Sequence, residues 1–163
     1  MSRENPLRFL PGVWKSYVLL FNTTNQIVNE RLSEEMKREG FDVSPREAWV
    51  LMAAKEKPLG QGVIADCLNI NTNVMVRMVD RLEKKGLARR TKDSRNRRGH
   101  KLEVTRKGHE LLKRLYEGWD SRTQRIFYPA TWDDIKRYEQ VARSIIDDHY
   151  SKKKRGPTRR PVL

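Results

Sequence analysis

The hydrophobic positions of the chain recur at helical spacing over most of its length. In residues 11–40, apolar side chains repeat every three or four positions, which predicts one helix that begins at its proline and ends at its glycine. Ser44, Pro45 and Glu47 then have the order of an N-cap, a first-turn proline and the glutamate of a capping box. A second helix is therefore expected to begin there and to stop at residues 57–58, where a proline follows a lysine.

Two short helical patterns separated by a turn follow. The first spans residues 62–68, and its apolar face is predicted to hold Val63, Ile64, Cys67 and Leu68. The second begins after the turn residues 69–72 and runs to Gly86, with an apolar stripe at i, i+3, i+4 and i+7. The members of this stripe are Met75, Met78, Val79 and Leu82. Two short helices joined in this way predict a helix-turn-helix.

A short two-stranded ribbon is expected after the second of these helices. Residues 87–91 have the composition of a strand, and residues 101–104 alternate polar and apolar positions as a returning strand would. The basic residues 92–100 between them are predicted to form a loop, because they are too many for a tight hairpin turn. A helix-turn-helix followed by such a ribbon is a winged helix.

The last third of the chain again shows helical patterns. Thr105 is expected to cap one long helix that ends at Pro129. A final helix is expected to begin at Thr131, followed by two aspartates in its first turn, and to end near Tyr150. The remaining residues 151–163 show no periodicity and are predicted to be disordered. The fold class is therefore mainly α, a winged helix-turn-helix with a two-stranded wing and long flanking helices.

The charge of the chain is concentrated in two segments. Its 35 Lys and Arg residues exceed its 21 Asp and Glu residues, which gives a net charge of +14. Residues 71–107 contain thirteen basic and four acidic residues, and residues 151–163 contain six basic residues and no acidic one. A basic surface that served only solubility would not be segregated in this way, whereas a nucleic-acid footprint would be.

Several classes of protein are excluded by what the sequence lacks. No apolar stretch is long enough to span a bilayer and no signal peptide is recognisable, so we expect a cytoplasmic protein that does not bind membranes. One cysteine and three separated histidines predict no metal site and no internal disulfide. We find no nucleophile with a histidine partner and no glycine-rich phosphate loop, so neither an enzyme nor a cofactor is expected.

The motifs of the winged segment carry a resemblance to a known family. They are the sequences VIA at 63–65, VDRLEKKGL at 79–87, double arginines at 89–90 and 97–98, and VTRKG at 104–108. With these motifs, residues 43–112 resemble the MarR family of bacterial and archaeal transcription regulators. Two departures are visible: Asn96 stands where the family usually has an aspartate that braces the wing, and glycines 60 and 62 stand at the start of the first short helix.

A protein of this kind is expected to place its second short helix in the major groove of DNA, with its N-terminal residues foremost. The candidate contacts are Asn71, Thr72, Asn73, Val76, Arg77 and Arg81. Asn73 has the chemistry to pair with adenine and Arg77 with guanine, while Val76 suits a thymine methyl group. The alternatives are that Asn71 only caps the helix and that Arg77 only contacts phosphate.

The wing supplies a second group of candidate contacts, namely Arg89, Arg90, Arg95, Arg97, Arg98 and Lys101. The resemblance makes Arg97 the residue expected to enter a narrow minor groove. Arg98 is equally well interpreted as an ion-pair partner of Asp93, and Arg89, Arg90 and Lys101 are expected to contact phosphate. The basic tail either adds non-specific phosphate contacts or is simply solvated.

The resemblance also implies a homodimer that reads a pseudo-palindromic duplex. Residues 1–40 would form an N-terminal dimerisation helix, 41–108 the DNA-binding winged helix, 109–150 the C-terminal dimerisation helices and 151–163 the basic tail. The aromatic and branched residues of both flanking segments support this, because they exceed what one small winged helix can bury. The alternative is a monomer whose long helices pack on themselves.

Many members of the family release DNA when a small aromatic ligand binds beside the dimerisation helices. The residues that could line such a cleft are Trp14, Arg46, Trp49 and Tyr116, although aromatic residues at helical spacing are more often plain core. Cys67 is predicted to be buried and therefore inert as a redox sensor. The predicted function is a dimeric DNA-binding regulator, a repressor released by a ligand; the alternative is a non-specific DNA- or RNA-associated winged-helix protein.

Overall fold

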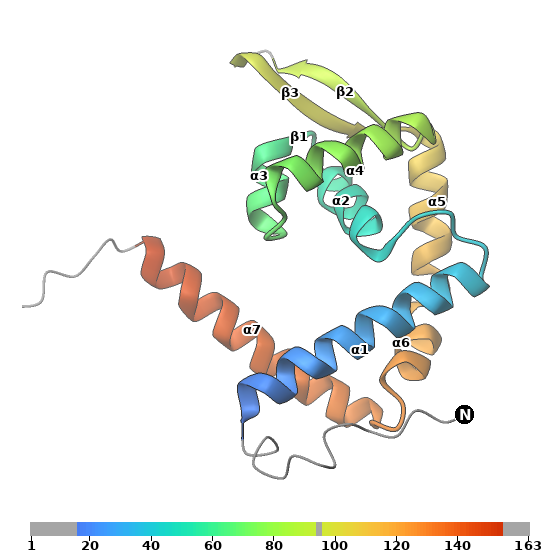
Figure 1. Ribbon diagram of the computed structural model, residues 1–163, viewed down its shortest axis with the longest axis vertical. Helices are drawn as coiled ribbons and strands as arrows, with labels where there is room; N and C mark the ends of the chain where they lie inside the picture. The colour runs from blue at the N-terminus through green and yellow to red at the C-terminus, as the bar shows by residue number, and fades with distance from the viewer. Residues whose placement is uncertain (1–15, 94–95, 155–163) are drawn as a thin grey trace, which may run out of the picture. The chain divides into compact units, whose positions relative to one another are not determined.

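A computed structural model describes residues 16–93 and 96–154 of the chain. The chain divides into two units, one up to Trp119 and one from Asp120 onward. The first unit holds α1 (Tyr17–Arg38), α2 (Pro45–Glu56), β1 (Leu59–Gly60), α3 (Gln61–Cys67), α4 (Thr72–Lys84), β2 (Ala88–Asp93), β3 (Asn96–Val104) and α5 (Arg106–Tyr116) (Figure 1). Helix α6 (Trp119–Phe127) begins at the boundary, and the second unit continues with α7 (Trp132–Lys154).

Helix α1 begins and ends at residues whose local chemistry fixes its bounds. The side chain of Ser16 accepts a hydrogen bond from the backbone N–H of Leu19 and forms the N-cap. At the other end Gly40 has a φ of +76°, and Phe41 donates its backbone N–H to the carbonyl of Met36. The predicted glycine stop is confirmed, whereas the predicted start at the proline of residue 11 lies outside the described residues.

The capping box of α2 is confirmed. The hydroxyl of Ser44 accepts the N–H of Glu47, and a carboxylate oxygen of Glu47 accepts the N–H of Ser44 at 2.9 Å. Pro45 occupies the first helical turn, where its missing N–H leaves no bond unmade. The helix ends at Glu56, as expected from the proline that follows.

Helices α3 and α4 form the predicted helix-turn-helix. All four residues of the predicted α4 stripe are buried, which confirms the helix and its inner face. The predicted apolar face of α3 is wrong in part, because Val63 and Cys67 are exposed and only Ile64 is fully buried. Seven residues make only two turns, so one side of α3 reaches the core and the rest faces solvent.

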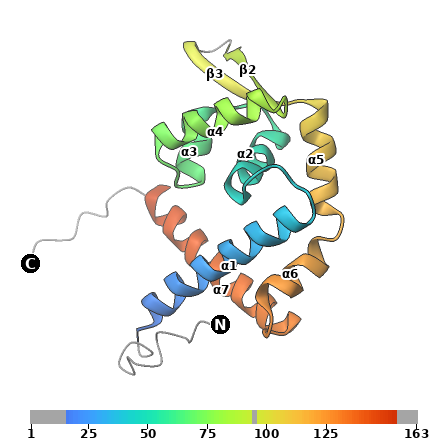
Figure 2. The same cartoon turned by 45° about the vertical axis from the view of Figure 1, so that its right-hand side comes forward.

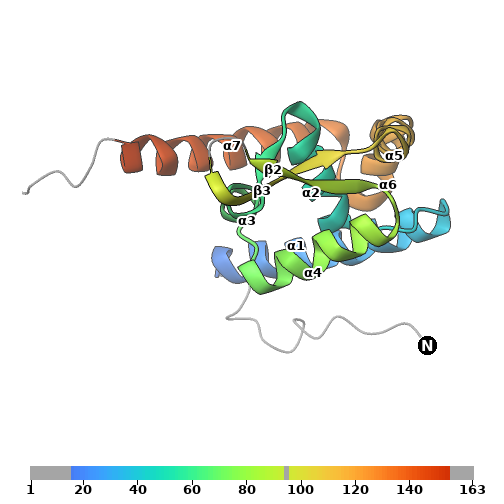
Figure 3. The ribbon, with the colours of Figure 1, turned by 90° about the horizontal axis from the view of Figure 1, so that it is seen from above.

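The sheet has three antiparallel strands in the order β1-β3-β2, and the two strands of the predicted wing are β2 and β3. Strand β1 adds two residues, Leu59 opposite Leu102 and Gly60 opposite Lys101. The prediction of a loop over residues 92–100 is wrong, because β2 continues to Asp93 and β3 begins at Asn96. Figure 2 shows β2 and β3 extending beyond α3 and α4 as a hairpin, and in Figure 3 α4 lies next to that hairpin.

The core of the winged helix is built from the inner faces of these elements. Its fully buried side chains include Val50 and Leu51 from α2, Ile64 from α3 and Leu102 from β3. Leu112 and Leu115 close it from α5. A core of this kind holds α4 rigidly against the other elements, with its polar side outward.

The helix predicted from Thr105 to Pro129 is two helices. Thr105 caps α5 as expected, accepting the N–H of Gly108 at 3.1 Å. The helix then stops at Tyr116, and Gly118 adopts a φ of +76° before α6 begins. A residue with positive φ cannot continue an α-helix, so the chain turns there.

Helix α7 begins where the sequence predicted. A carboxylate oxygen of Asp134 accepts hydrogen bonds from the backbone N–H of Thr131 at 2.9 Å and from the hydroxyl of Thr131 at 2.6 Å. The same hydroxyl accepts the backbone N–H of Asp134. These hydrogen bonds from Thr131, first from its side chain and then from its backbone, lower the pKa of Asp134. The prediction of disorder beyond Tyr150 is wrong for the next four residues, because α7 continues to Lys154.

Candidate nucleic-acid interface

The outer side of α4 carries the predicted major-groove contacts in one exposed row. Asn73, Val76 and Arg77 are exposed on the first two turns of the helix, and Arg81 and Lys84 follow at helical spacing. Asn71 forms the N-cap, its side-chain oxygen accepting the N–H of Asn73 at 2.9 Å. The geometry therefore favours the cap interpretation of Asn71, and Thr72 and Asn73 are the first exposed side chains of the helix itself.

Arg77 is the arginine of this row best placed to contact DNA directly. Among the residues that the structure describes, it has no ion-pair partner, and the same holds for Lys84 and Lys92. An arginine with an uncommitted guanidinium can donate two parallel hydrogen bonds to guanine or bind phosphate. Both interpretations drawn from the sequence remain consistent with its position.

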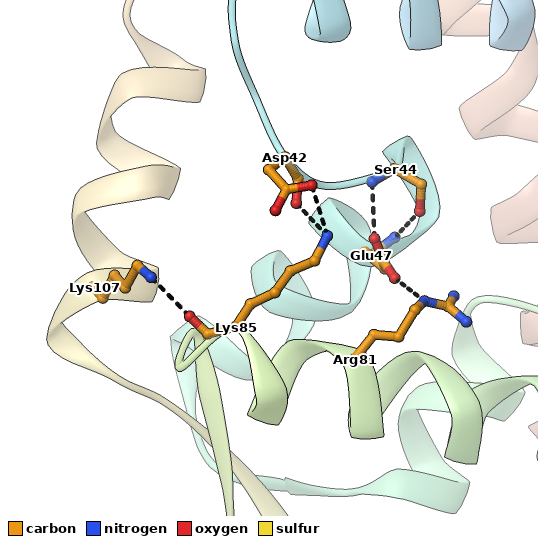
Figure 4. A network of polar contacts seen from close by, with 6 residues as sticks. All are labelled: Asp42, Ser44, Glu47, Arg81, Lys85 and Lys107. Carbon is orange, nitrogen blue, oxygen red and sulfur yellow. Dashed lines mark hydrogen bonds and ion pairs between the residues drawn. The ribbon is translucent and has the colours of Figure 1, made fainter.

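Arg81 is held by a carboxylate from another helix. Its Nε lies 2.6 Å from Oε1 of Glu47 on α2, and the side chain of Glu47 is only 4% exposed (Figure 4). Burial by itself raises the pKa of Glu47, but the backbone N–H of Ser44 and the guanidinium of Arg81 more than offset it, so the pKa lies below its ordinary value. The carboxylate is therefore ionised and ties α4 to α2.

A second link holds the same end of α4, one turn after Arg81. Lys85 donates from its Nζ to the backbone carbonyl of Asp42 and lies 3.1 Å from the carboxylate of the same residue. The backbone carbonyl of Lys85 in turn accepts a hydrogen bond from Nζ of Lys107 at 2.8 Å (Figure 4). These bonds connect the C-terminus of α4 with the α1–α2 loop and with α5, so this end of the helix is held in place.

Arg90 braces the wing against α4. One terminal nitrogen meets the carboxylate of Glu83 and the other lies 2.6 Å from Asp80, while the backbone N–H of Arg90 donates to Glu83. Both terminal nitrogens are thus occupied by carboxylates of the same chain. This geometry favours a structural brace over the phosphate contact expected for Arg90.

Arg89 is paired within the wing. Its Nε and Nη2 each lie 3.0 Å from an oxygen of Glu103 on the neighbouring strand. These hydrogen bonds raise the pKa of Arg89 and lower the pKa of Glu103. The pair is exposed, so its net stabilisation is small, and a phosphate can compete for the guanidinium only by displacing Glu103. Lys101, opposite Thr91 on the same ribbon, is half-buried.

The tip of the wing lies at the edge of what the structure describes. Arg95 is outside the described residues, and of Arg97 and Arg98 only the backbone, in β3, is described. The expected pair of Arg98 with Asp93 and the side chain of Asn96 also fall outside the described part. Their predicted roles stay predictions.

The four candidate ligand residues are not brought together among the described residues. Trp14 lies outside them, Trp49 is half-buried, and Tyr116 contacts Lys55, whose Nζ lies 4.7 Å from the centre of the ring. Arg46 alone lines an open cleft of about 510 Å³ between α1 and the start of α2. The rest of the cleft lining is mostly polar, namely Asn22, Asn25, Gln26, Asn29, Glu30, Ser33, Ser44 and Pro45. The aromatic lining predicted for such a cleft is thus absent from this one.

Glu47 and Asp42 could not be recognised from the sequence as partners of α4. Glu47 could be recognised as a capping-box residue, but its second partner is 34 residues further along the chain. Only tertiary packing brings the two together, and no local pattern reports it.

The described residues hold no group of three or more acidic, cysteine or histidine side chains that could bind a metal ion. None of the helices described is both long and apolar enough to cross a membrane.

Comparison with known proteins gives the same fold. The model of the MarR family matches residues 41–99, and no curated protein sequence matches the chain. A crystal structure of MarR is 20% identical with a TM-score of 0.70, over 95% of this chain and 98% of that one. A cysteine-to-serine mutant of MarR from E. coli in complex with operator DNA is 18% identical with a TM-score of 0.70, over 85% of this chain and 96% of that one.

A MarR-family transcriptional regulator from Rhodococcus sp. RHA1 is also similar. It is 22% identical with a TM-score of 0.70, over 80% of this chain and 95% of that one. At these identities the likeness establishes the fold. The predicted mainly α, winged helix-turn-helix architecture is confirmed.

Proposed function

We propose that this chain, whose residues 41–99 match the model of the MarR family, is a DNA-binding transcription regulator of that family. The observation that carries the proposal is the outer row of α4, which is exposed and contains Arg77, an arginine without an ion-pair partner among the described residues. Two ion pairs hold the C-terminal end of this helix against its neighbours. Structures of the same fold include MarR from E. coli with operator DNA and MepR from S. aureus with DNA.

In this proposal α4 reads the major groove and the wing follows the backbone into the adjacent minor groove. Asn73, Val76 and Arg77 contact base edges, and Arg97 enters the minor groove where it is narrow. Arg90 keeps the hairpin at a fixed angle to α4 because it bonds two carboxylates of that helix. A rigid angle lets one chain contact two grooves in a defined register.

The proposed regulator binds as a homodimer. Large apolar side chains remain exposed along α1, including Tyr17, Val18 and Phe21, and along α7, including Ile145 and Ile146. Apolar surface in such continuous rows is a usual mark of an interface between chains. Two copies related by a two-fold axis would read half-sites about 10 base pairs apart.

We propose repression as the regulatory outcome, because a dimer that covers a promoter site excludes other proteins from it. The protein would act in the cytoplasm, where bacterial and archaeal DNA lies. A small effector that releases the DNA needs to favour a dimer whose two α4 helices no longer match successive grooves. The cleft beside Arg46 is the place we assign to such an effector.

The test is selection of bound duplexes from a random pool at near-physiological salt, with structured RNA as competitor. A regulator of this kind should return a palindromic site that survives the competitor, and Arg97→Ala should weaken its binding mainly at A·T-rich flanks. If instead no consensus emerges and binding vanishes as salt rises, the protein is a non-specific DNA- or RNA-associated winged helix and the proposal fails.

A further inference from the structure

Both carboxylate oxygens of Glu47 accept hydrogen bonds. One oxygen accepts the backbone N–H of Ser44 at 2.9 Å, and the other lies 2.6 Å from Nε of Arg81. The residue is 3% exposed, so the carboxylate is shielded from water and from any ligand. A capping box needs only the first of these bonds, and the second reaches across to the helix that faces DNA in the proposed function.

Arg81 keeps both terminal nitrogens available despite this bond. It uses only Nε, and within the described part of the chain its Nη1 and Nη2 make no hydrogen bond. The other two paired arginines differ, since Arg90 has both terminal nitrogens on carboxylates and Arg89 has Nε and Nη2 on Glu103. Among these three arginines, Arg81 alone combines an internal anchor with a free donor edge.

The side chain that carries this free edge is exposed on α4. The side chain of Arg81 is 52% exposed and stands one turn after Arg77 in the same row of the helix. The guanidinium is planar, so fixing Nε fixes the plane in which the remaining N–H groups donate. That plane is set before any DNA arrives.

We propose that Glu47 is a positioning residue for DNA binding: it holds Arg81 so that the two terminal nitrogens meet a backbone phosphate beside the groove that α4 occupies. The inference rests on the proposed function and deepens it, because it assigns one phosphate contact and the group that orients it. Arg81 binds the phosphate through Nη1 and Nη2, and Glu47 itself never touches DNA.

The physical effect is preorganisation. A free arginine side chain loses rotamer freedom when it binds, and an arginine already held in place has lost that freedom on folding. Releasing Arg81 from Glu47 should therefore lower the affinity for the selected duplex by about 3- to 10-fold, the range that ordering one long side chain represents.

The first experiment measures the affinity of Glu47→Gln for the selected duplex. Glutamine retains an oxygen to accept the N–H of Ser44, so the helix cap survives, but it has no second acceptor for Arg81. The substitution also removes a negative charge, which by electrostatics alone would raise the affinity for DNA. A decrease of 3- to 10-fold is therefore opposite in sign to the charge effect.

A double-mutant cycle separates positioning from a merely structural role. Glu47→Gln is combined with Arg81→Ala, and Arg81→Lys is measured alone because lysine keeps the charge and loses the planar fork. If Glu47 acts through Arg81, the loss caused by Glu47→Gln disappears in the Arg81→Ala background, and Arg81→Lys alone lowers the affinity by a similar factor. Glu103→Gln is the matched control, since freeing Arg89 should leave the affinity unchanged or raise it.

Three results would overturn the inference while leaving the proposed function intact. They are an unchanged or higher affinity of Glu47→Gln, an equal loss in both backgrounds of the cycle, or an Arg81→Lys protein that binds like the wild type. The last applies even if Glu47→Gln does not fold, because Arg81 is half exposed. If the wild-type protein itself selects no duplex, the proposed function fails and the inference with it.

Discussion

Gly108, in the first turn of α5, lies against the backbone of Leu87, which is between α4 and β2. A Cβ at this position would overlap the carbonyl oxygen of Leu87 and lie 2.6 Å from Cγ1 of Val104. Gly108→Ala is therefore expected to destabilise the protein by about 1–3 kcal/mol, the usual cost of overpacking a site that cannot relax. Chemical unfolding followed by circular dichroism measures it.

Gly62→Ala is the matched control for this prediction. Gly62 also lies in a helix, but a Cβ there would meet no atom within 4 Å. Alanine has the higher helix propensity, so this variant should be as stable as the wild type or more stable by up to about 1 kcal/mol. Equal stability of the two variants would show that α5 does not pack on Leu87 as described.

The ion pair of Glu47 should make stability depend on pH. The folded protein holds the pKa of Glu47 below its ordinary value of 4.5, so folding favours the ionised carboxylate. The stabilisation is fully present above the unfolded pKa and is lost as the pH falls through the folded one. Relative to Glu47→Gln, we expect about 1–2 kcal/mol at pH 7, because bonds to charged groups are strong but Arg81 is half exposed.

Urea unfolding of the wild type and of Glu47→Gln from pH 7 to pH 3 measures this difference. It should be constant down to about pH 5 and shrink below that value. A difference that grows on acidification would mean that the folded pKa is raised instead, and Glu47 would then be a buried acid without an effective partner.

Single residues also show which features can be predicted from a sequence. The caps at Ser44 and Thr105 were predictable because each capping bond joins residues three positions apart. The bond between Glu47 and Arg81 was not, because it depends on how α2 packs against α4. Cys67 was assigned to the core from its apolar neighbours, and it is exposed because α3 buries only one side.

At the scale of elements, the arginines of α4 and of the wing differ in their ion-pair partners. Arg77 has no ion-pair partner among the described residues, whereas Arg89 is held by Glu103. Arg77→Ala should lower the affinity for the selected duplex by about 5- to 100-fold, the equivalent of one good base contact. Fluorescence anisotropy on the selected site measures it.

Arg89→Ala serves as the control for this prediction. Both variants remove one positive charge from an exposed position, so they share the non-specific loss of phosphate attraction. A larger loss for Arg77→Ala that shrinks on duplexes altered at one base pair would place Arg77 on that pair. Equal losses on every duplex would leave it with phosphate contacts only.

Helices could be predicted where apolar residues recur at helical spacing. Strands that depend only on backbone pairing could not be predicted. The stripe of α4 reported a helix because one face is buried. In contrast, β1 is two residues long, and the outer halves of β2 and β3 consist of polar residues, so their pairing leaves no alternating pattern. The break at Gly118 was missed because apolar spacing continues from α5 into α6 across it.

At the scale of the whole molecule, the net charge of +14 indicated that the protein binds a polyanion. It did not indicate how many of the protein's cationic side chains would contact that partner. Arg81, Lys85, Arg89 and Arg90 all have carboxylate partners within the chain. The basic segment is therefore partly neutralised in the folded protein. The cations of this segment that are left to attract a polyanion are those without a carboxylate partner.

The apolar row of α7 predicts how a dimer would be disrupted. Ile145 is 62% exposed in the single chain, and Ile145→Glu should shift the protein to monomer and lower its affinity for the full duplex site. Gln140→Glu, on the polar side of the same helix, adds the same charge and should change neither property. Sedimentation velocity decides this, and an unaltered dimer in Ile145→Glu would exclude α7 from the interface.

The proposed function requires two α4 helices to read one duplex together. The measurement that tests this directly compares the affinity of the wild-type protein for its selected site with that for the same site carrying five extra base pairs between the half-sites. Half a helical turn moves the second half-site to the opposite side of the duplex, so we predict that affinity falls to that of an isolated half-site. Unchanged affinity would show that each chain binds alone and would contradict the dimeric regulator.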